Sequence, residues 1–319
     1  MAVSADRRCV VRVAVVQAAA SLFEVGGGLG LFEVLLRRAR DAGAELVVFP
    51  EAFLGGYPKG ASFGATVGER TSEGRALFAR YRRSAIEIPG ESFDRVRAAV
   101  ADAGCLVVVG VVERAGHTLY CSSLLFDQAG TLIGHHRKLM PTGVERLIWG
   151  QGDGSDIAVI PTDLGRIGMA ICWESYLPLY RAALYEQGVE IYCAPTVDAR
   201  DVWTATMRHI AVEGRCFVLS ANQFATRGDY PADYPLDEQV PPEHPMINGG
   251  SCVVDPFGEL LAGPVFGQPE LLVTDLDRGL LDGAYLDLDV TGHYSRPDLL
   301  RLDHTPRPPR AVTTRPDRG

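Results

Sequence analysis

The chain has 319 residues, of which 47% are hydrophobic, and it carries a formal net charge of -9 at pH 7. Its length and apolar content are sufficient for a large buried core, in one domain or in two smaller ones. The negative charge argues against a surface that binds nucleic acid or an anionic membrane, and it favours a small uncharged or acidic substrate.

The predicted secondary structure begins with alternating strands and helices. In chain order, apolar patterns and closing glycines predict a strand at Val11–Gln17, a helix at Leu31–Ala42, a strand at Glu45–Phe49, a helix at Ser92–Ala103 and a strand at Leu106–Val112. Two hairpins follow, formed by Ser122–Phe126 with Thr131–His136 and by Cys252–Val254 with Glu259–Ala262. Alternating elements combined with hairpins predict an α/β fold with mixed sheets.

A short sequence repeat indicates two similar halves. Gly43–Pro50 and Gly188–Pro195 each contain a helix-ending Gly, then a Glu, then an apolar strand that stops at Pro. The repeat is weak, because ordinary helix-to-strand connections could also produce it.

Two segments are expected to lie outside regular structure. Phe224–Gly250 contains five prolines, Pro231, Pro235, Pro241, Pro242 and Pro245, and is interpreted as a functional loop. Residues 304–319 have almost no apolar content and are expected to be disordered in an isolated subunit. The predicted organisation is therefore one domain over residues 1–303 followed by this tail.

The cysteines indicate a reducing compartment. They number seven, with no C-x-x-C pair and no zinc-like spacing, and are interpreted as reduced thiols of a cytoplasmic protein. Arg7 and Arg8 precede an apolar run as in a signal peptide, but Arg12 and Gln17 interrupt that run. No apolar stretch approaches the roughly 20 residues of a membrane span.

Three reactive side chains follow predicted strands. Cys172 ends the apolar run that starts at Arg166, while Glu51 and Lys138 end two other runs. Side chains at the carboxyl ends of parallel strands face the crevice where ligands bind. A thiol, a carboxylate and an amine there could serve as nucleophile, proton carrier and cation for developing negative charge. Taken singly, Cys172 could also be a buried core residue, and Glu51 and Lys138 could be solvated charges at strand ends.

The motifs around these residues favour a catalytic role for them. They are Phe49-Pro50-Glu51-Ala-Phe-Leu-Gly-Gly-Tyr57-Pro58, His136-Arg-Lys138-Leu-Met-Pro-Thr142 and Cys172-Trp-Glu-Ser-Tyr-Leu-Pro178. In this order they resemble the nitrilase superfamily, whose Glu-Lys-Cys triad lies in such segments. Pro141–Ser155 and Gly292–Asp298 resemble its nitrile-hydrolysing branch, so the resemblance extends from about Val11 to about Asp303. Ser175 departs from it, because many nitrilases have Asn or His there.

The resemblance implies a four-layer α-β-β-α sandwich of two similar halves and the hydrolysis of a nitrile to a carboxylic acid and ammonia. Glu51 would be the general base, Lys138 the cation and Cys172 the nucleophile. Glu145 matches the family's second active-site glutamate, although it could also be an ordinary loop carboxylate beside Arg146. The resemblance further implies a homo-oligomer, a dimer that extends to a spiral or larger assembly.

Tyr57 and Trp173 adjoin triad residues and are candidates for the wall of the substrate pocket, although aromatic residues at strand ends pack in cores just as often. No cofactor or metal is expected. His135 and His136 are adjacent on a predicted strand and so point to opposite faces, which disfavours chelation of one ion.

Three other functions remain open at this stage. An amidase or N-carbamoyl amide hydrolase would use the same triad on a carbonyl group, and the two branch-specific segments disfavour it. A non-catalytic scaffold would have lost a triad residue, and none is lost here. A redox-sensing thiol protein would be modified at Cys172 by peroxide before a nitrile reacted there.

Overall fold

The computed structural model describes residues 9–236 and 240–303. Two mixed sheets form its centre. The first has the order β15-β1-β2-β5-β6-β7, with bounds Glu270–Asp277, Val10–Gln17, Leu46–Val48, Leu106–Ala115, Thr118–Phe126 and Leu132–Arg137. The second has the order β12-β13-β11-β10-β9-β8, with β14 beside β13, and bounds Phe224–Thr226, Pro245–Val254, Phe217–Ser220, Ile191–Cys193, Gly165–Met169, Val159–Thr162 and, for β14, Leu260–Phe266.

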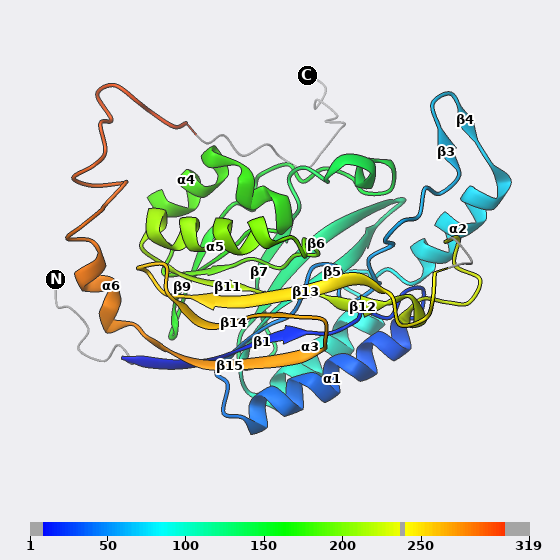
Figure 1. Cartoon of the computed structure of the whole chain (residues 1–319), viewed down its shortest axis with the longest axis horizontal. Coiled ribbons are helices and arrows are strands. Elements are labelled where there is room, and N and C mark those ends of the chain that lie inside the picture. Colours follow the sequence, from blue (N-terminus) through cyan, green and yellow to red (C-terminus); the bar gives the residue numbers. More distant parts are fainter. Residues whose placement is uncertain (1–8, 237–239, 304–319) are drawn as a thin grey trace, which may run out of the picture.

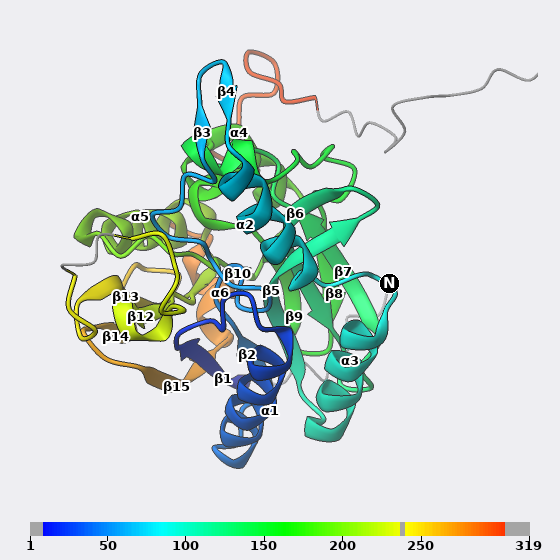
Figure 2. The same cartoon turned by 90° about the vertical axis from the view of Figure 1, so that its right-hand side faces the viewer.

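Helices cover the outer face of each sheet, so the molecule has four layers (Figure 1). The helices α1 (Val25–Asp41) and α3 (Glu91–Ala103) lie side by side on the first sheet (Figure 2), and α4 (Pro178–Glu186) and α5 (Asp201–Gly214) lie on the second. The remaining helical segments are α2 (Ser72–Arg83), α6 (Gly279–Ala284), η1 (Gly143–Leu147), η2 (Cys172–Tyr176) and η3 (Arg227–Asp229). A small hairpin, β3 (Ala65–Thr66) with β4 (Glu69–Arg70), projects beyond the sheets before α2.

The alternation of apolar residues along the central strands explains the layers. In β2, Leu46 and Val48 pack between the two sheets, whereas Val47 packs against α1 and α3. In β10, Ile191 and Cys193 likewise face the first sheet. Successive strand residues point to opposite faces, so a strand that is apolar at every position is buried on both. The predicted four-layer sandwich is confirmed.

The two sheets repeat one arrangement. Each has a parallel triplet, β1-β2-β5 in the first and β9-β10-β11 in the second, followed by antiparallel strands. The middle strands of the triplets, β2 and β10, lie in the two segments of the weak sequence repeat. The repeat therefore reflects equivalent positions in the two halves.

Two expectations about element boundaries were wrong. α1 begins at Val25 and not at Leu31, because a turn rich in glycine is held as helix by packing, with Gly28 close to Leu54. Phe224–Gly250 is not wholly irregular, since Phe224 pairs with Asn248 where β12 meets β13. The prolines there lie mainly between these strands, and Pro245 begins β13.

The predicted hairpins are confirmed as β6-β7 and β13-β14. The predicted disordered tail, residues 304–319, lies outside the described residues. Within the described part, no helix has the length and apolar character to cross a membrane.

Candidate active site

Glu51 lies just after β2 and is completely buried. Its Oε1 accepts a hydrogen bond from Lys138 Nζ at 2.6 Å and from the Cys121 thiol at 3.5 Å. Its Oε2 is also buried but makes no hydrogen bond within the described part of the chain. Burial raises the pKa of Glu51, while the Lys138 ammonium acts in the opposite direction. The site therefore holds a carboxylate oxygen with unused capacity to accept a proton.

Lys138 follows β7 and is shared by two carboxylates. Its Nζ donates to Glu51 Oε1 and, at 2.9 Å, to Glu145 Oε2, and the side chain is fully buried. Burial disfavours the Lys138 ammonium, but Glu51 and the other nearby acidic groups outweigh it and hold the pKa of Lys138 well above its ordinary value. A positive charge is thus fixed in a buried site.

Cys172 occupies a strained turn after β9. It lies beyond the end of β9, as the first residue of η2, and has a φ of +52°, where residues other than Gly are uncommon. Its N–H donates to the Pro195 carbonyl oxygen at 2.8 Å, and its Sγ accepts from the Thr196 hydroxyl at 3.1 Å. Burial raises the pKa of the Cys172 thiol, and the Glu51 carboxylate raises it further. The thiol therefore needs a base beside it to become a nucleophile.

Glu145 belongs to the same cluster. It lies in η1 and accepts hydrogen bonds from Lys138, from the Thr142 N–H at 2.6 Å and from the Tyr57 hydroxyl at 2.8 Å. Arg146 instead donates to the Pro141 carbonyl oxygen. The geometry disfavours the interpretation of Glu145 as a loop carboxylate paired with its neighbour.

The two predicted aromatic residues have different surroundings. Tyr57 lies at the site, where its hydroxyl holds Glu145 and its ring meets Trp149 at 5.8 Å between centroids. Trp173 is 41% exposed, and its Nε1 donates to Asp198 while the Arg200 guanidinium lies over its ring. Tyr57 therefore orients Glu145, and Trp173 contacts an ion pair between the buried Asp198 and the exposed Arg200.

A buried network joins the segments that carry Lys138 and Cys172. Glu174 accepts from the N–H groups of Leu139 and Ile171, and the two ring nitrogens of His136 face Glu174 and Asp156. Burial lowers the pKa of His136, but these two carboxylates outweigh it and raise that pKa to about 10. Glu174 is thus bound into the framework behind the site.

The neighbouring histidine has separate partners. His135 Nε2 contacts Glu113 at 2.9 Å, on the opposite face of β7 from His136. No group of three or more His, Cys, Asp or Glu with the geometry of a metal site occurs among the described residues.

Sequence reasoning missed four residues that contact the cluster. Cys121 donates to Glu51, Gln223 Nε2 donates to the Glu51 carbonyl oxygen at 2.7 Å, and the Trp149 ring lies 5.8 Å from Lys138 Nζ. Thr196, on the Cys172 sulfur, is the fourth. Two of them had a usable signal: Thr196 follows Pro195 as Glu51 follows Pro50 in the repeat, and Trp149 lies in the segment Pro141–Ser155.

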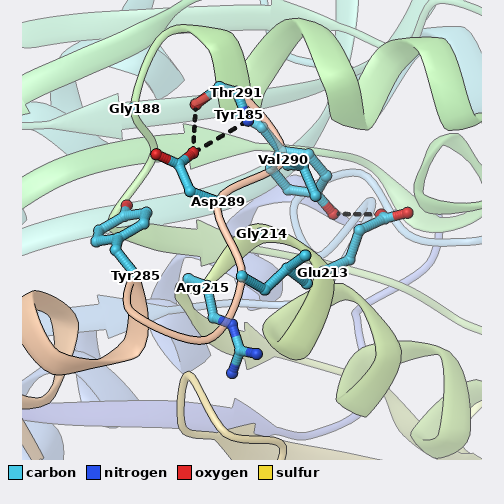
Figure 3. Close-up of a pocket in the computed structure, with 10 residues that line it drawn as sticks. Tyr185, Gly188, Glu213, Gly214, Arg215, Tyr285, Asp289, Val290 and Thr291 are labelled. Carbon is cyan, nitrogen blue, oxygen red and sulfur yellow. Dashed lines mark hydrogen bonds between the residues drawn. The ribbon is translucent and has the colours of Figure 1, made fainter. Parts of the chain in front are cut away.

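A separate cavity of about 250 Å³ contains none of these residues (Figure 3). Its polar side chains satisfy one another: Tyr185 donates to Glu213, and Thr291 donates to Asp289. Arg215, at its edge, donates to the Pro256 carbonyl oxygen. Arg215 Nε is buried without a hydrogen-bond partner among the described residues, but the cavity has no counterpart to the cluster of carboxylate, ammonium and thiol around Glu51.

Glu145→Gln is expected to lower kcat on the order of 100-fold, because the amide cannot hold the Lys138 ammonium as the carboxylate does and a misplaced catalytic group costs about this much. Steady-state kinetics of ammonia release measures the effect. Arg146→Gln, one residue away in η1, is the matched control and should retain nearly normal kinetics. Normal kinetics for Glu145→Gln would return that residue to a structural role.

The chain is similar to known proteins over most of its length. The carbon-nitrogen hydrolase family model matches residues 12–284. A bifunctional nitrilase/nitrile hydratase of Nicotiana tabacum is 50% identical over 305 residues, covering 93% of this chain and 88% of that protein. An aliphatic nitrilase of Sinorhizobium fredii is 49% identical over 304 residues, covering 95% and 98%.

Solved structures share the fold at low sequence identity. An amidase of the nitrilase superfamily from Nesterenkonia superposes with a TM-score of 0.65 at 22% identity, covering 91% of this chain and 95% of that one. The NitFhit protein of C. elegans gives a TM-score of 0.71 at 18% identity, covering 92% of this chain and 66% of that one.

Proposed function

The chain belongs to the carbon-nitrogen hydrolase family, and from this premise we propose that it is a nitrilase, which converts an organic nitrile and two molecules of water into a carboxylic acid and ammonia. The observation that carries the proposal is the buried cluster of Glu51, Lys138 and Cys172. Identity of about half to relatives named as nitrilases supports the nitrile as substrate.

The first step forms a bond between Cys172 and the substrate. The bare Oε2 of Glu51 accepts the thiol proton, and the sulfur attacks the nitrile carbon. One π bond of the nitrile breaks, and its electron pair moves to nitrogen, which takes up a proton to give a thioimidate. Lys138 stabilises the negative charge that develops on nitrogen, and its donors are already oriented in a buried site.

Two waters complete the reaction. The first adds to the thioimidate carbon, and one of its protons is accepted by Glu51 and delivered to nitrogen, which gives a tetrahedral intermediate. The remaining hydroxyl proton then passes to nitrogen in the same way as the carbon-nitrogen bond breaks, so that ammonia departs and a thioester remains. The second water attacks the thioester carbon, the carbon-sulfur bond breaks, and the acid leaves with the thiol restored. Glu51 suits this repeated proton transfer because its raised pKa makes it a stronger base than a solvated carboxylate.

A substrate panel tests the proposed reaction. Aliphatic, arylacetonitrile and aromatic nitriles, each paired with its corresponding amide, are incubated with the protein, and ammonia, acid and amide are measured separately. We expect acid and ammonia in equal amounts from at least one nitrile and slower release from its amide. Ammonia from amides alone would replace the nitrilase with an amidase or N-carbamoyl amide hydrolase. Amide is measured because two related tobacco proteins are named as bifunctional nitrilase/nitrile hydratases.

We also propose that the chain acts in the cytoplasm. Cys105, Cys121, Cys172, Cys193, Cys216 and Cys252 are buried thiols without disulfide bonds. This state fits a reducing compartment. Fractionation with an antibody against the chain would place it there, and recovery in an oxidising compartment would contradict the proposal.

The end of the described chain supports a homo-oligomer. After α6, residues 286–303 form no helix or strand, and Leu286, Leu299 and Leu300 are 84%, 68% and 80% exposed. Apolar side chains so exposed in one segment are typical of a surface that a partner covers. We propose that another copy of the chain covers it, and that residues 1–303 form the hydrolase domain.

Two truncations are expected to distinguish the role of residues 292–303 from that of residues 304–319. Ending the chain before Gly292 should leave dimers or insoluble material with little activity, whereas ending it after Asp303 should leave a substantial fraction active. Size-exclusion chromatography with light scattering measures the particle size, and ammonia release measures activity. An active monomer that lacks everything after Gly292 would contradict the proposed assembly.

A further inference from the structure

The Thr196 hydroxyl points at the sulfur of Cys172. Thr196 Oγ1 lies 3.1 Å from Cys172 Sγ, and Thr196 is completely buried. The donor of this hydrogen bond to the sulfur is a neutral hydroxyl. The charged groups that act on Cys172 are Glu51, Lys138, Glu145 and Arg200, and the Tyr57 hydroxyl is a further titratable group near it.

The hydroxyl is held in this direction by the backbone around it. The Asp198 N–H donates to Thr196 Oγ1 at 3.0 Å, so that one lone pair is occupied and the hydroxyl proton is left to donate. The Thr196 N–H donates to the Ala221 carbonyl oxygen, and the Cys172 N–H donates to the carbonyl oxygen of Pro195, both at 2.8 Å. Both side chains are therefore fixed relative to each other before any substrate binds.

The position of Thr196 repeats that of Glu51. Each follows a proline at the end of the middle strand of a parallel triplet, Glu51 after β2 and Thr196 after β10. One half of the fold thus supplies a proton acceptor at the Cys172 thiol, and the other half supplies a proton donor to its sulfur.

We propose that Thr196 is a further catalytic residue, whose hydroxyl donates a hydrogen bond to Cys172 Sγ and stabilises the thiolate that attacks the substrate. The same bond stabilises the sulfur when the thioester carbon-sulfur bond breaks and the thiolate leaves. The hydroxyl keeps its proton throughout, and Glu51 remains the group that takes the thiol proton. This inference rests on the proposed function only for the role of Cys172 as nucleophile.

The test compares Thr196→Val, Thr196→Ser and Thr196→Ala. Valine keeps the shape and removes the hydroxyl, serine keeps the hydroxyl, and alanine matches serine with the hydroxyl removed. The readout is the rate at which iodoacetamide alkylates Cys172 between pH 6 and 10, followed by mass spectrometry of the Cys172 peptide, together with kcat and KM for ammonia release. Alkylation needs no nitrile, so it reports on the thiol even if the proposed substrate is wrong.

The matched control is Ser220→Ala. Ser220 is a buried hydroxyl on β11 that accepts from Trp203 Nε1 at 2.8 Å and donates to the Ala194 carbonyl oxygen, without a bond to Cys172. Its loss should lower the melting temperature and leave the pH profile of Cys172 alkylation unchanged. A purely structural role for Thr196 would give the same pattern.

We expect Thr196→Val and Thr196→Ala to slow Cys172 alkylation about 10-fold or more at each pH between 6 and 10 and to lower kcat about 10- to 100-fold, the range for a hydrogen bond to a charged group. Thr196→Ser should stay close to the wild type in both. If valine prevents folding, the serine and alanine pair decides the question. Alkylation profiles within about twofold of each other for serine and alanine would overturn the proposal.

Discussion

Cys172→Ala is expected to abolish ammonia release while the protein remains folded. No other group occupies the place of the sulfur between Glu51 and Thr196, so a covalent nucleophile cannot be replaced by a neighbour. The lost volume is one sulfur atom in a cluster with many apolar members, so the melting temperature should change little. Ammonia release and thermal melting, measured on the same preparation, test both halves of this expectation.

Cys172→Ser extends the same test. A hydroxyl is far less acidic than a thiol, and a single carboxylate such as Glu51 cannot ionise it to a useful extent at neutral pH. This variant should also be inactive, although it preserves shape and hydrogen bonding. Ammonia release above a trace in a folded alanine variant would show that the reaction does not pass through Cys172.

Glu51→Gln and Lys138→Met are each expected to lower kcat on the order of 100-fold or more, the usual scale for loss of a general base or of a group that stabilises charge. Glutamine keeps the size of Glu51 but cannot accept the thiol proton. Methionine keeps the length of Lys138 but removes the cation that two carboxylates share. Steady-state kinetics on the nitrile identified by the substrate panel measures both.

The lysine variant should also be less stable. Removing Lys138 leaves the buried Glu51 and the partly buried Glu145 without their shared partner, and breaking a buried pair from one side costs on the order of 3 to 5 kcal/mol. Lys59 provides the matched control, because it is the other lysine of the chain and lies exposed on the surface. Lys59→Met should match the wild type, and a Lys138→Met enzyme with kcat within a few-fold of normal would remove Lys138 from the mechanism.

The reactive residues could be predicted from the sequence because each follows a strand. Glu51, Lys138 and Cys172 come after β2, β7 and β9, and strand ends can be recognised where an apolar run stops. The structure brings the side chains into one buried cluster. The strained conformation of Cys172 was not foreseen, because a positive φ at a cysteine depends on the contacts that hold it.

Other features depended on contacts between distant segments. Gln223 reaches Glu51 across 172 positions of sequence, and no local pattern indicates such a bond. The early start of α1 and the pairing of β12 with β13 likewise result from tertiary packing, which outweighs the local preferences of Gly and Pro. Thr196 could have been predicted from the sequence, because it follows Pro195 at the end of one repeat segment as Glu51 follows Pro50 at the end of the other.

Intact-mass measurement during turnover tests the central claim, a covalent intermediate between Cys172 and a nitrile. With a nitrile that the protein hydrolyses, quenching in the steady state should show a mass increase equal to the acyl or thioimidate group, mapped to the Cys172 peptide. Prior alkylation of Cys172 should remove both the adduct and ammonia release. Continued release of ammonia and acid from a protein whose Cys172 is fully alkylated would contradict the account.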